Sequence, residues 1–180
     1  MHTQKRTMLW VNVLGGTAVL ASYAHGFLTH PQTSGALWGG VPDWLRPLYT
    51  LSMLLAAAGY LLFTWFLHFR VDPGQVRIAG RFGFGCINAL YALVLIPSAL
   101  WMPLTFLVID GWTGTLWFAI RAVLAMVGLG SLGMLAALLT LTPRRPKMPY
   151  CLAVVGALAF CVQTAVLDAC VWPAFFPLPR

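Results

Sequence analysis

Residues 41–69 read VPDWLRPLYTLSMLLAAAGYLLFTWFLHF. The part from Leu48 to Phe69 contains no Asp, Glu, Lys or Arg. It is long enough to cross the ~30 Å hydrocarbon core of a bilayer as an α-helix, which needs roughly 20 residues. Pro47 suits the first turn of such a helix, because the N–H that proline lacks would be unpaired there anyway. This stretch therefore predicts a membrane-spanning helix.

The composition of the whole chain agrees with a membrane location. The 180 residues are 60% hydrophobic and 8% charged, with a mean hydropathy of +0.82, which leaves too little polar surface to cover a water-soluble globule. Helices are expected, because backbone groups in lipid must be satisfied within each segment. We predict an all-α integral membrane bundle, a single domain over residues 1–180, with five transmembrane helices at approximately 8–28, 48–69, 83–106, 115–141 and 150–172.

The charges predict how the bundle is oriented. A formal net charge of +7 comes from 11 Lys and Arg residues against four acids. The bases lie in short loops and form no single patch, so we expect the lipid bilayer and no nucleic acid as partner. Of the ten bases outside the predicted spans, eight fall on one side and only Arg46 and Arg180 on the other. This bias predicts a cytoplasmic N-terminus and an outer C-terminus, in a bacterial inner or photosynthetic membrane. A cleavable signal peptide over residues 1–24 is the competing interpretation of the first segment.

No catalytic signature occurs in the sequence. There is no glycine-rich phosphate loop, nucleophile elbow or HExxH motif, and the four cysteines form no CxxC pair. We therefore expect neither an enzyme nor a metal site. In the last segment, small side chains recur every fourth residue and predict close approach of a neighbouring helix; they are Ala153, Ala157, Cys161, Ala165 and Ala169.

Three ionisable residues are expected in a polar layer of the outer leaflet, namely His25, Arg121 and Asp168. An ionisable side chain within a span is costly and calls for a reason. Arg121 and Asp168 either neutralise each other across the interface of the fourth and fifth helices, or each reaches the outer headgroups separately. His25 is either an interfacial histidine or a haem or chlorophyll ligand. Polar residues are not expected to continue into the inner leaflet, which argues against a transporter or ion pathway.

The longest connection runs from residue 29 to residue 47 and contains Trp38 and Trp44. Aromatic residues at this level anchor in the headgroup zone. A loop so placed is also a candidate lid over the outer end of the bundle. Both interpretations stay open at this point.

Four motifs, in order along the chain, resemble those of the tryptophan-rich sensory protein and translocator protein family, the peripheral benzodiazepine receptors. They are YAHGFLTHP (23–31), PDWLRPLYTLSM (42–53), ALYALVLIPSALWMPLTF (89–106) and MPY (148–150). The resemblance implies a five-helix bundle that binds a porphyrin, sterol or other apolar ligand in a pocket beneath residues 29–47. The ligand-binding residues that it implies are Trp44, Tyr49, Met53, Ser98, Trp101 and Cys161.

The chain also departs from the family pattern. Tyr49 replaces a tryptophan, and Ser98 and Cys161 stand where the family has asparagines. Two functions follow. The first is binding of a flat apolar ligand, a tetrapyrrole, carotenoid, sterol or other lipid, in an outer-leaflet pocket. The second is a non-catalytic accessory subunit of a larger photosynthetic or respiratory membrane complex, whose faces pack against other helices and pigments. Self-association as a homodimer is compatible with the ligand-binding function.

Overall fold

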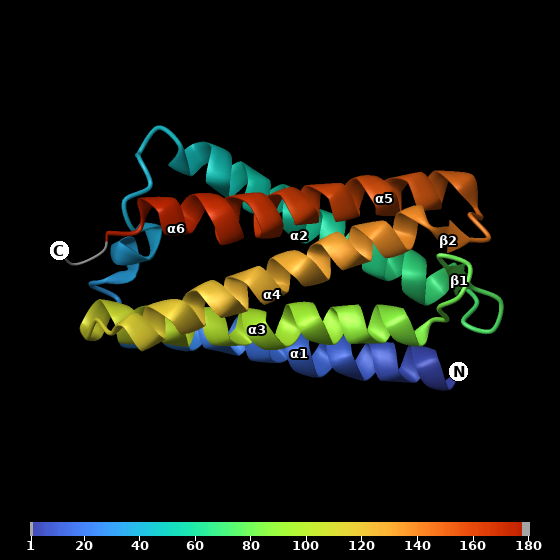
Figure 1. Ribbon diagram of the computed structural model, residues 1–180, viewed down its shortest axis with the longest axis horizontal. Coiled ribbons are helices and arrows are strands. Elements are labelled where there is room, and N and C mark those ends of the chain that lie inside the picture. Colours follow the sequence, from blue (N-terminus) through green and yellow to red (C-terminus); the bar gives the residue numbers. More distant parts are fainter. Residues whose placement is uncertain (1, 178–180) are drawn as a thin grey trace.

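Five long helices lie side by side in the computed structural model, which describes residues 2–177 (Figure 1). Met1 and residues 178–180, with the Arg180 counted above, lie outside the described part. Each long helix is apolar enough to span a membrane, so the predicted all-α five-helix membrane bundle is confirmed. The helices are α1 (Thr3–Thr29), α2 (Arg46–Phe69), α3 (Gly85–Asp110), α4 (Gly114–Leu139) and α5 (Lys147–Cys161), the last continued by the π-helix η2 (Val162–Val171) and the short α6 (Trp172–Phe175).

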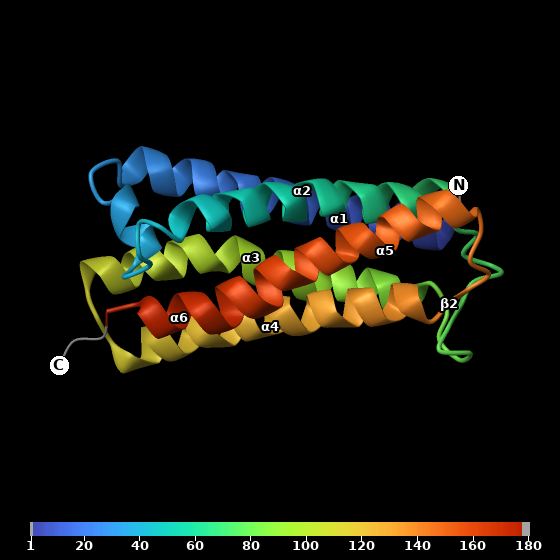
Figure 2. The ribbon, with the colours of Figure 1, turned by 90° about the horizontal axis from the view of Figure 1, so that it is seen from above.

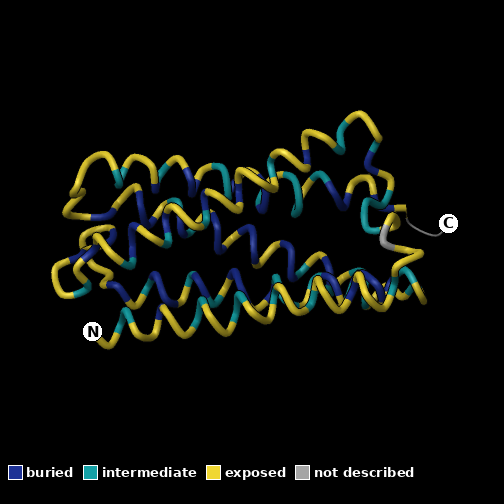
Figure 3. Tube along the Cα trace, turned by 180° about the vertical axis from the view of Figure 1, so that it is seen from behind, coloured by how far each residue is buried: buried dark blue, intermediate teal, exposed yellow. Residues whose placement is uncertain are grey.

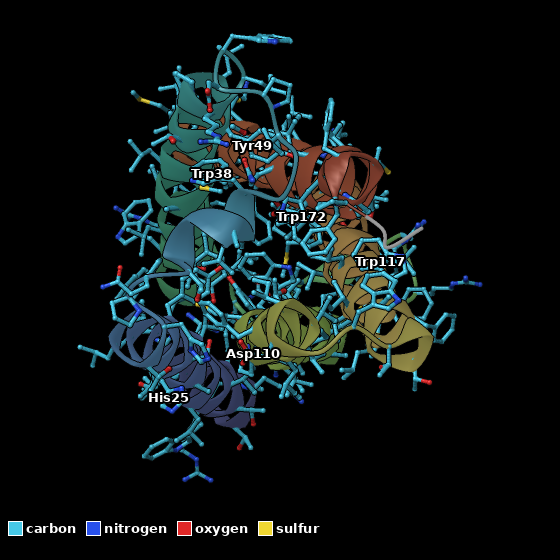
Figure 4. All side chains as sticks on the ribbon, turned by 90° about the vertical axis from the view of Figure 1, so that its left-hand side faces the viewer. His25, Trp38, Tyr49, Asp110, Trp117 and Trp172 are labelled. Carbon is cyan, nitrogen blue, oxygen red and sulfur yellow. The ribbon has the colours of Figure 1, made fainter. Side chains whose placement is uncertain are left out.

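The helices form an incomplete ring in the order α1, α3, α4, α5, α2 (Figure 4). α3 packs between α1 and α4, while α5 packs on α2 and then, through η2, increasingly on α4. Figure 2 shows this oblique course of α5 and α6 from α2 towards α4. Buried residues line the inward sides of the helices and exposed ones the outer sides, as expected where lipid covers the outer faces (Figure 3).

The two glycines Gly59 and Gly156 allow α2 and α5 to approach closely. A Cβ atom on Gly156 would lie 2.7 Å from the carbonyl oxygen of Gly59, closer than real side chains approach. Next to this contact, Ala153 and Ala157 are completely buried. On the other side, a Cβ on Gly128 of α4 would lie 3.5 Å from the Cβ atoms of Ala165 and Ala169. The predicted packing strip of the last span is therefore confirmed.

The two ends of the bundle differ in chemistry. One end, which we call the basic end, carries the N-terminus and a small antiparallel sheet of β1 (Arg77–Ile78) and β2 (Leu141–Thr142) (Figure 1). The eight bases counted on one side lie there: Lys5, Arg6, Arg70, Arg77, Arg81, Arg144, Arg145 and Lys147. The other end, the tryptophan end, carries the loop 29–47 with the 3-10 helix η1 (Ser34–Trp38).

Candidate ligand-binding site

Aromatic and polar side chains from four parts of the chain meet inside the tryptophan end. Trp101 of α3 lies between Tyr23 of α1, at a ring-centroid distance of 6.0 Å, and Trp172 of α6, at 5.8 Å. α2 contributes Tyr49 and η2 contributes two polar residues. We call this cluster the cage, and its residues are Tyr23, Tyr49, Trp101, Gln163, Asp168 and Trp172.

The polar side of the cage is built by the π-helix. The Gln163 Nε2 atom donates a hydrogen bond of 2.8 Å to Oδ1 of Asp168. These residues are five apart, and in an α-helix they would point about 140° away from each other. In η2 the backbone is wound more widely, with i to i+5 bonding, and the two side chains share a face. π-helices are rare and concentrate at functional sites.

Tyr49 joins the polar side of the cage to α2. Its side chain is only 1% exposed, and its hydroxyl donates a hydrogen bond of 2.6 Å to the Leu167 carbonyl. This hydrogen bond joins α2 to the residue that precedes Asp168 in η2.

Two buried polar atoms of the cage have no hydrogen-bond partner among the described residues. They are the indole Nε1 of Trp101, a donor, and Oε1 of Gln163, an acceptor. An unsatisfied buried polar group costs about 1–3 kcal/mol, so native structures usually provide it with a partner. The third such atom, Oδ1 of Asn88, lies near the basic end. A bound molecule with both an acceptor and a donor would satisfy the two atoms of the cage.

The loop 29–47 covers the cage from the end of the bundle (Figure 4). Trp172 Nε1 donates a 2.8 Å hydrogen bond to the Leu37 carbonyl, and the Gly40 N–H donates one of 2.9 Å to the Phe175 carbonyl. Trp38 of η1 packs edge-on against Tyr49. The prediction that this loop lies over the end of the bundle is confirmed, and two hydrogen bonds hold it there.

Of the six ligand-binding residues that the resemblance implies, the structure brings two into the cage, Tyr49 and Trp101. Trp44 and Met53 are 72% and 44% exposed and lie on the outer surface. The exposure of Trp44 agrees with the interpretation that this residue anchors in the headgroup zone. Ser98 is half-buried and bonds back to the Val94 carbonyl of its own helix. Cys161 is buried in the small-residue strip.

The predicted polar layer is not assembled. Arg121 is exposed and forms no ion pair among the described residues, while Asp168 bonds to Gln163. The predicted ion pair between Arg121 and Asp168 is therefore wrong. Arg121 lies on the outer side of α4 beside the buried Ile120, near the helix end, where a long cationic side chain reaches headgroups. His25 is exposed and points away from the cage (Figure 4).

A second polar cluster lies deeper, towards the basic end. The Tyr60 hydroxyl of α2 donates a hydrogen bond to Asn12 Oδ1 of α1, and Thr64 bonds to Tyr91 of α3 at 2.7 Å. The expectation that polar groups stop in the outer leaflet is therefore wrong. Hydroxyl and amide groups in these apolar segments pair with one another across helices, which costs far less than leaving them unpaired.

His, Cys, Asp and Glu side chains are dispersed over the described part of the chain. Within residues 2–177, no group of three or more His, Cys, Asp and Glu side chains could hold a metal ion. An open pocket of about 420 Å³ lies at the basic end, far from the cage; it is lined by His2, Lys5, Phe69, Arg70, Val71, Asp72 and Pro73.

Comparison with known proteins adds no identification. No family model, curated protein or solved structure matches the chain. The resemblance of the four motifs therefore stays a hypothesis.

Proposed function

We propose that this membrane protein binds a flat apolar ligand in the cage beneath residues 29–47. The observation that carries the proposal is the buried indole N–H of Trp101, which lacks a partner at the centre of an aromatic cluster. Ligand sites in proteins are mostly apolar and aromatic, with a few polar groups that fix orientation. The cage has this composition. The motif resemblance to the translocator protein family supports the same function.

The cage is partly accessible. Tyr23 is 38% exposed, and Trp101 and Asp168 are half-buried. These residues lie on three different helices, so a planar molecule that enters would contact several walls at once. A tetrapyrrole, carotenoid or sterol could stack on Trp101 and Trp172. No reaction is required by this proposal.

The charge bias supports the expected orientation. Eight bases gather at the basic end, where the positive-inside rule places the cytoplasm. We propose that the N-terminus is cytoplasmic and that the cage lies in the outer leaflet of a bacterial inner or photosynthetic membrane. A ligand would then reach the cage from the outer leaflet.

A titration with octaethylporphyrin, a flat porphyrin without carboxyl groups, tests the proposed function. Replacing Trp101 with Leu removes the central ring and its N–H, so we expect roughly tenfold weaker binding. The matched control is Trp10→Leu, because Trp10 is 56% exposed on α1, outside the cage. Absorbance of the porphyrin reports binding. The proposal fails if Trp101→Leu and Trp10→Leu bind octaethylporphyrin equally well.

A second candidate function is an accessory subunit of a larger membrane complex. The observation that favours it is α1, which buries only Met8 and Gly26 among its described residues and so leaves a long apolar face for another helix. Purification in mild detergent distinguishes the two functions. Co-migration with large partners supports the subunit, and a monomer or dimer with a bound small molecule supports the ligand-binding protein.

A further inference from the structure

We infer that the ligand of the cage is a lipophilic cation, a flat apolar molecule whose protonated amine binds Asp168. The inference rests on the proposed ligand-binding function and adds the charge of the ligand to it. Three independent features of the cage carry it: an acid without a basic partner, two adjacent acceptor oxygens, and a series of aromatic rings.

Asp168 differs from the other acids of the chain in what it contacts. Asp43 pairs with Arg46 at 2.9 Å and Asp110 with His30 at 3.3 Å, whereas Asp72 accepts the backbone N–H of Gly74. These three lie at or beyond helix ends, and Asp168 lies within the last spanning helix. An acid within a span usually serves an ion or ligand.

The groups that face Asp168 are neutral. Gln163 bonds to it from its own helix, and the Tyr49 hydroxyl of α2 bonds to the carbonyl of Leu167, the residue before it. α4 carries Arg121 on its exposed side. Among the described residues, no Lys, Arg or His forms an ion pair with Asp168. The described residues therefore supply no basic partner for this carboxyl, and a cationic ligand could form the ion pair that the chain leaves unmade.

The hydrogen-bonding pattern selects a donor. Gln163 uses its amide N–H on Asp168, which leaves the amide oxygen buried and unpaired. A carboxylate and an amide oxygen side by side accept hydrogen bonds, and an ammonium group has several N–H donors to give. An anionic ligand would place two negative charges together in a medium of low polarity, which is unfavourable.

Aromatic rings complete the recognition of a cation. Tyr23, Trp101 and Trp172 form a continuous series with centroid distances of 6.0 and 5.8 Å. The faces of aromatic rings attract cations, and cages of such rings are the usual protein sites for substituted ammonium ions. An apolar aromatic frame on the ligand would stack on the same rings. A ligand that combines a cationic group with an aromatic frame would contact both the polar and the aromatic side of the cage.

Two probes of the same shape test the inference. 9-Aminoacridine is a flat three-ring molecule that is cationic at neutral pH, and anthracene has a similar three-ring frame without charge. Binding of each to the purified protein is measured by quenching of tryptophan fluorescence, with detergent micelles alone as the reference. The variants are Asp168→Asn and, as a matched control, Asp110→Asn at the same end of the bundle.

The wild-type protein is expected to bind 9-aminoacridine at least about tenfold more tightly than anthracene, the factor of one charge-assisted hydrogen bond. Asp168→Asn should abolish this preference and keep the affinity for anthracene, whereas Asp110→Asn should keep both. Equal affinities for the two probes in the wild type would overturn the inference and leave the proposed function intact. Failure to bind either probe would overturn both.

A further variant keeps the test decisive if Asp168→Asn does not fold. Gln163→Met replaces the amide by a side chain of similar length without hydrogen-bonding groups. It should reduce the preference for 9-aminoacridine several-fold, because one acceptor is lost and Asp168 loses its positioning partner. A preference for 9-aminoacridine that is unchanged in Gln163→Met would contradict the inference.

Discussion

Gln163 and Asp168 lie five residues apart on one helix and are joined by a 2.8 Å hydrogen bond. The π-helical winding of η2 makes this contact possible. Arg121, on the outer side of α4, takes no part in it. The hydrogen-bond partner of the acid is therefore found within its own span.

The first prediction is that Arg121 and Asp168 contribute to stability independently. Because they do not contact each other, the effects of Arg121→Gln and Asp168→Asn on the unfolding free energy should add to within about 0.5 kcal/mol in the double variant. Denaturation of the three variants in detergent measures this. A coupling above about 1 kcal/mol would show that the two residues interact.

The second prediction concerns the contact between α2 and α5. Leu at position 156 would collide with the backbone of Gly59, so Gly156→Leu should destabilise the bundle by about 3 kcal/mol or more. Gly16→Leu is the control, because a Cβ at Gly16 meets nothing within 4 Å. Thermal unfolding in detergent compares them. Similar melting temperatures for both variants would refute the close approach.

The third prediction concerns the covering loop. Trp172→Phe keeps an aromatic ring but removes the N–H that holds the Leu37 carbonyl. Backbone amides of residues 36–41 should then exchange with solvent faster, as local opening becomes easier. Trp44→Phe, at an exposed position, should leave the exchange unchanged. Hydrogen exchange measured by mass spectrometry compares the two variants. Equal exchange rates in both would show that the hydrogen bond from Trp172 to Leu37 does not hold the loop.

The fourth prediction concerns the inner polar cluster. Tyr60→Phe removes the hydroxyl that bonds to Asn12 and should cost about 1 kcal/mol of stability, as for other hydrogen bonds between membrane helices. Tyr23→Phe is the control, since its hydroxyl has no hydrogen bond among the described residues. Chemical unfolding of the two variants checks this. A larger loss of unfolding free energy in Tyr23→Phe than in Tyr60→Phe would contradict the hydrogen bond between Tyr60 and Asn12.

Most of the fold follows from hydropathy alone. Each predicted span agrees with a helix to within five residues, because hydrocarbon thickness dictates helix length and lipid leaves the backbone no alternative. The four-residue spacing of Ala153, Ala157 and Cys161 also placed the packing face of α5 correctly. Periodicity is informative wherever the helix is a regular α-helix.

The cage was only half predictable, for two physical reasons. In a regular α-helix of 3.6 residues per turn, Gln163 and Asp168 lie on different faces. Their spacing in the sequence therefore does not indicate the contact that the π-helix makes. Depth arguments also place a residue along the membrane normal but do not say which side of the helix it occupies. For that reason depth predicts one polar layer for His25, Arg121 and Asp168, although the side chains of His25 and Arg121 are exposed. Tyr23 and Trp172 could have been found from their aromatic character at the same depth.

The most direct test of the proposed site is an experimental structure of the protein with 9-aminoacridine. We expect the ring system stacked on Trp101 and Trp172, with an N–H group of the acridinium cation within hydrogen-bond distance of the Asp168 carboxyl. A probe bound on the lipid-facing surface, or a cage filled by its own side chains in the presence of saturating probe, would contradict it.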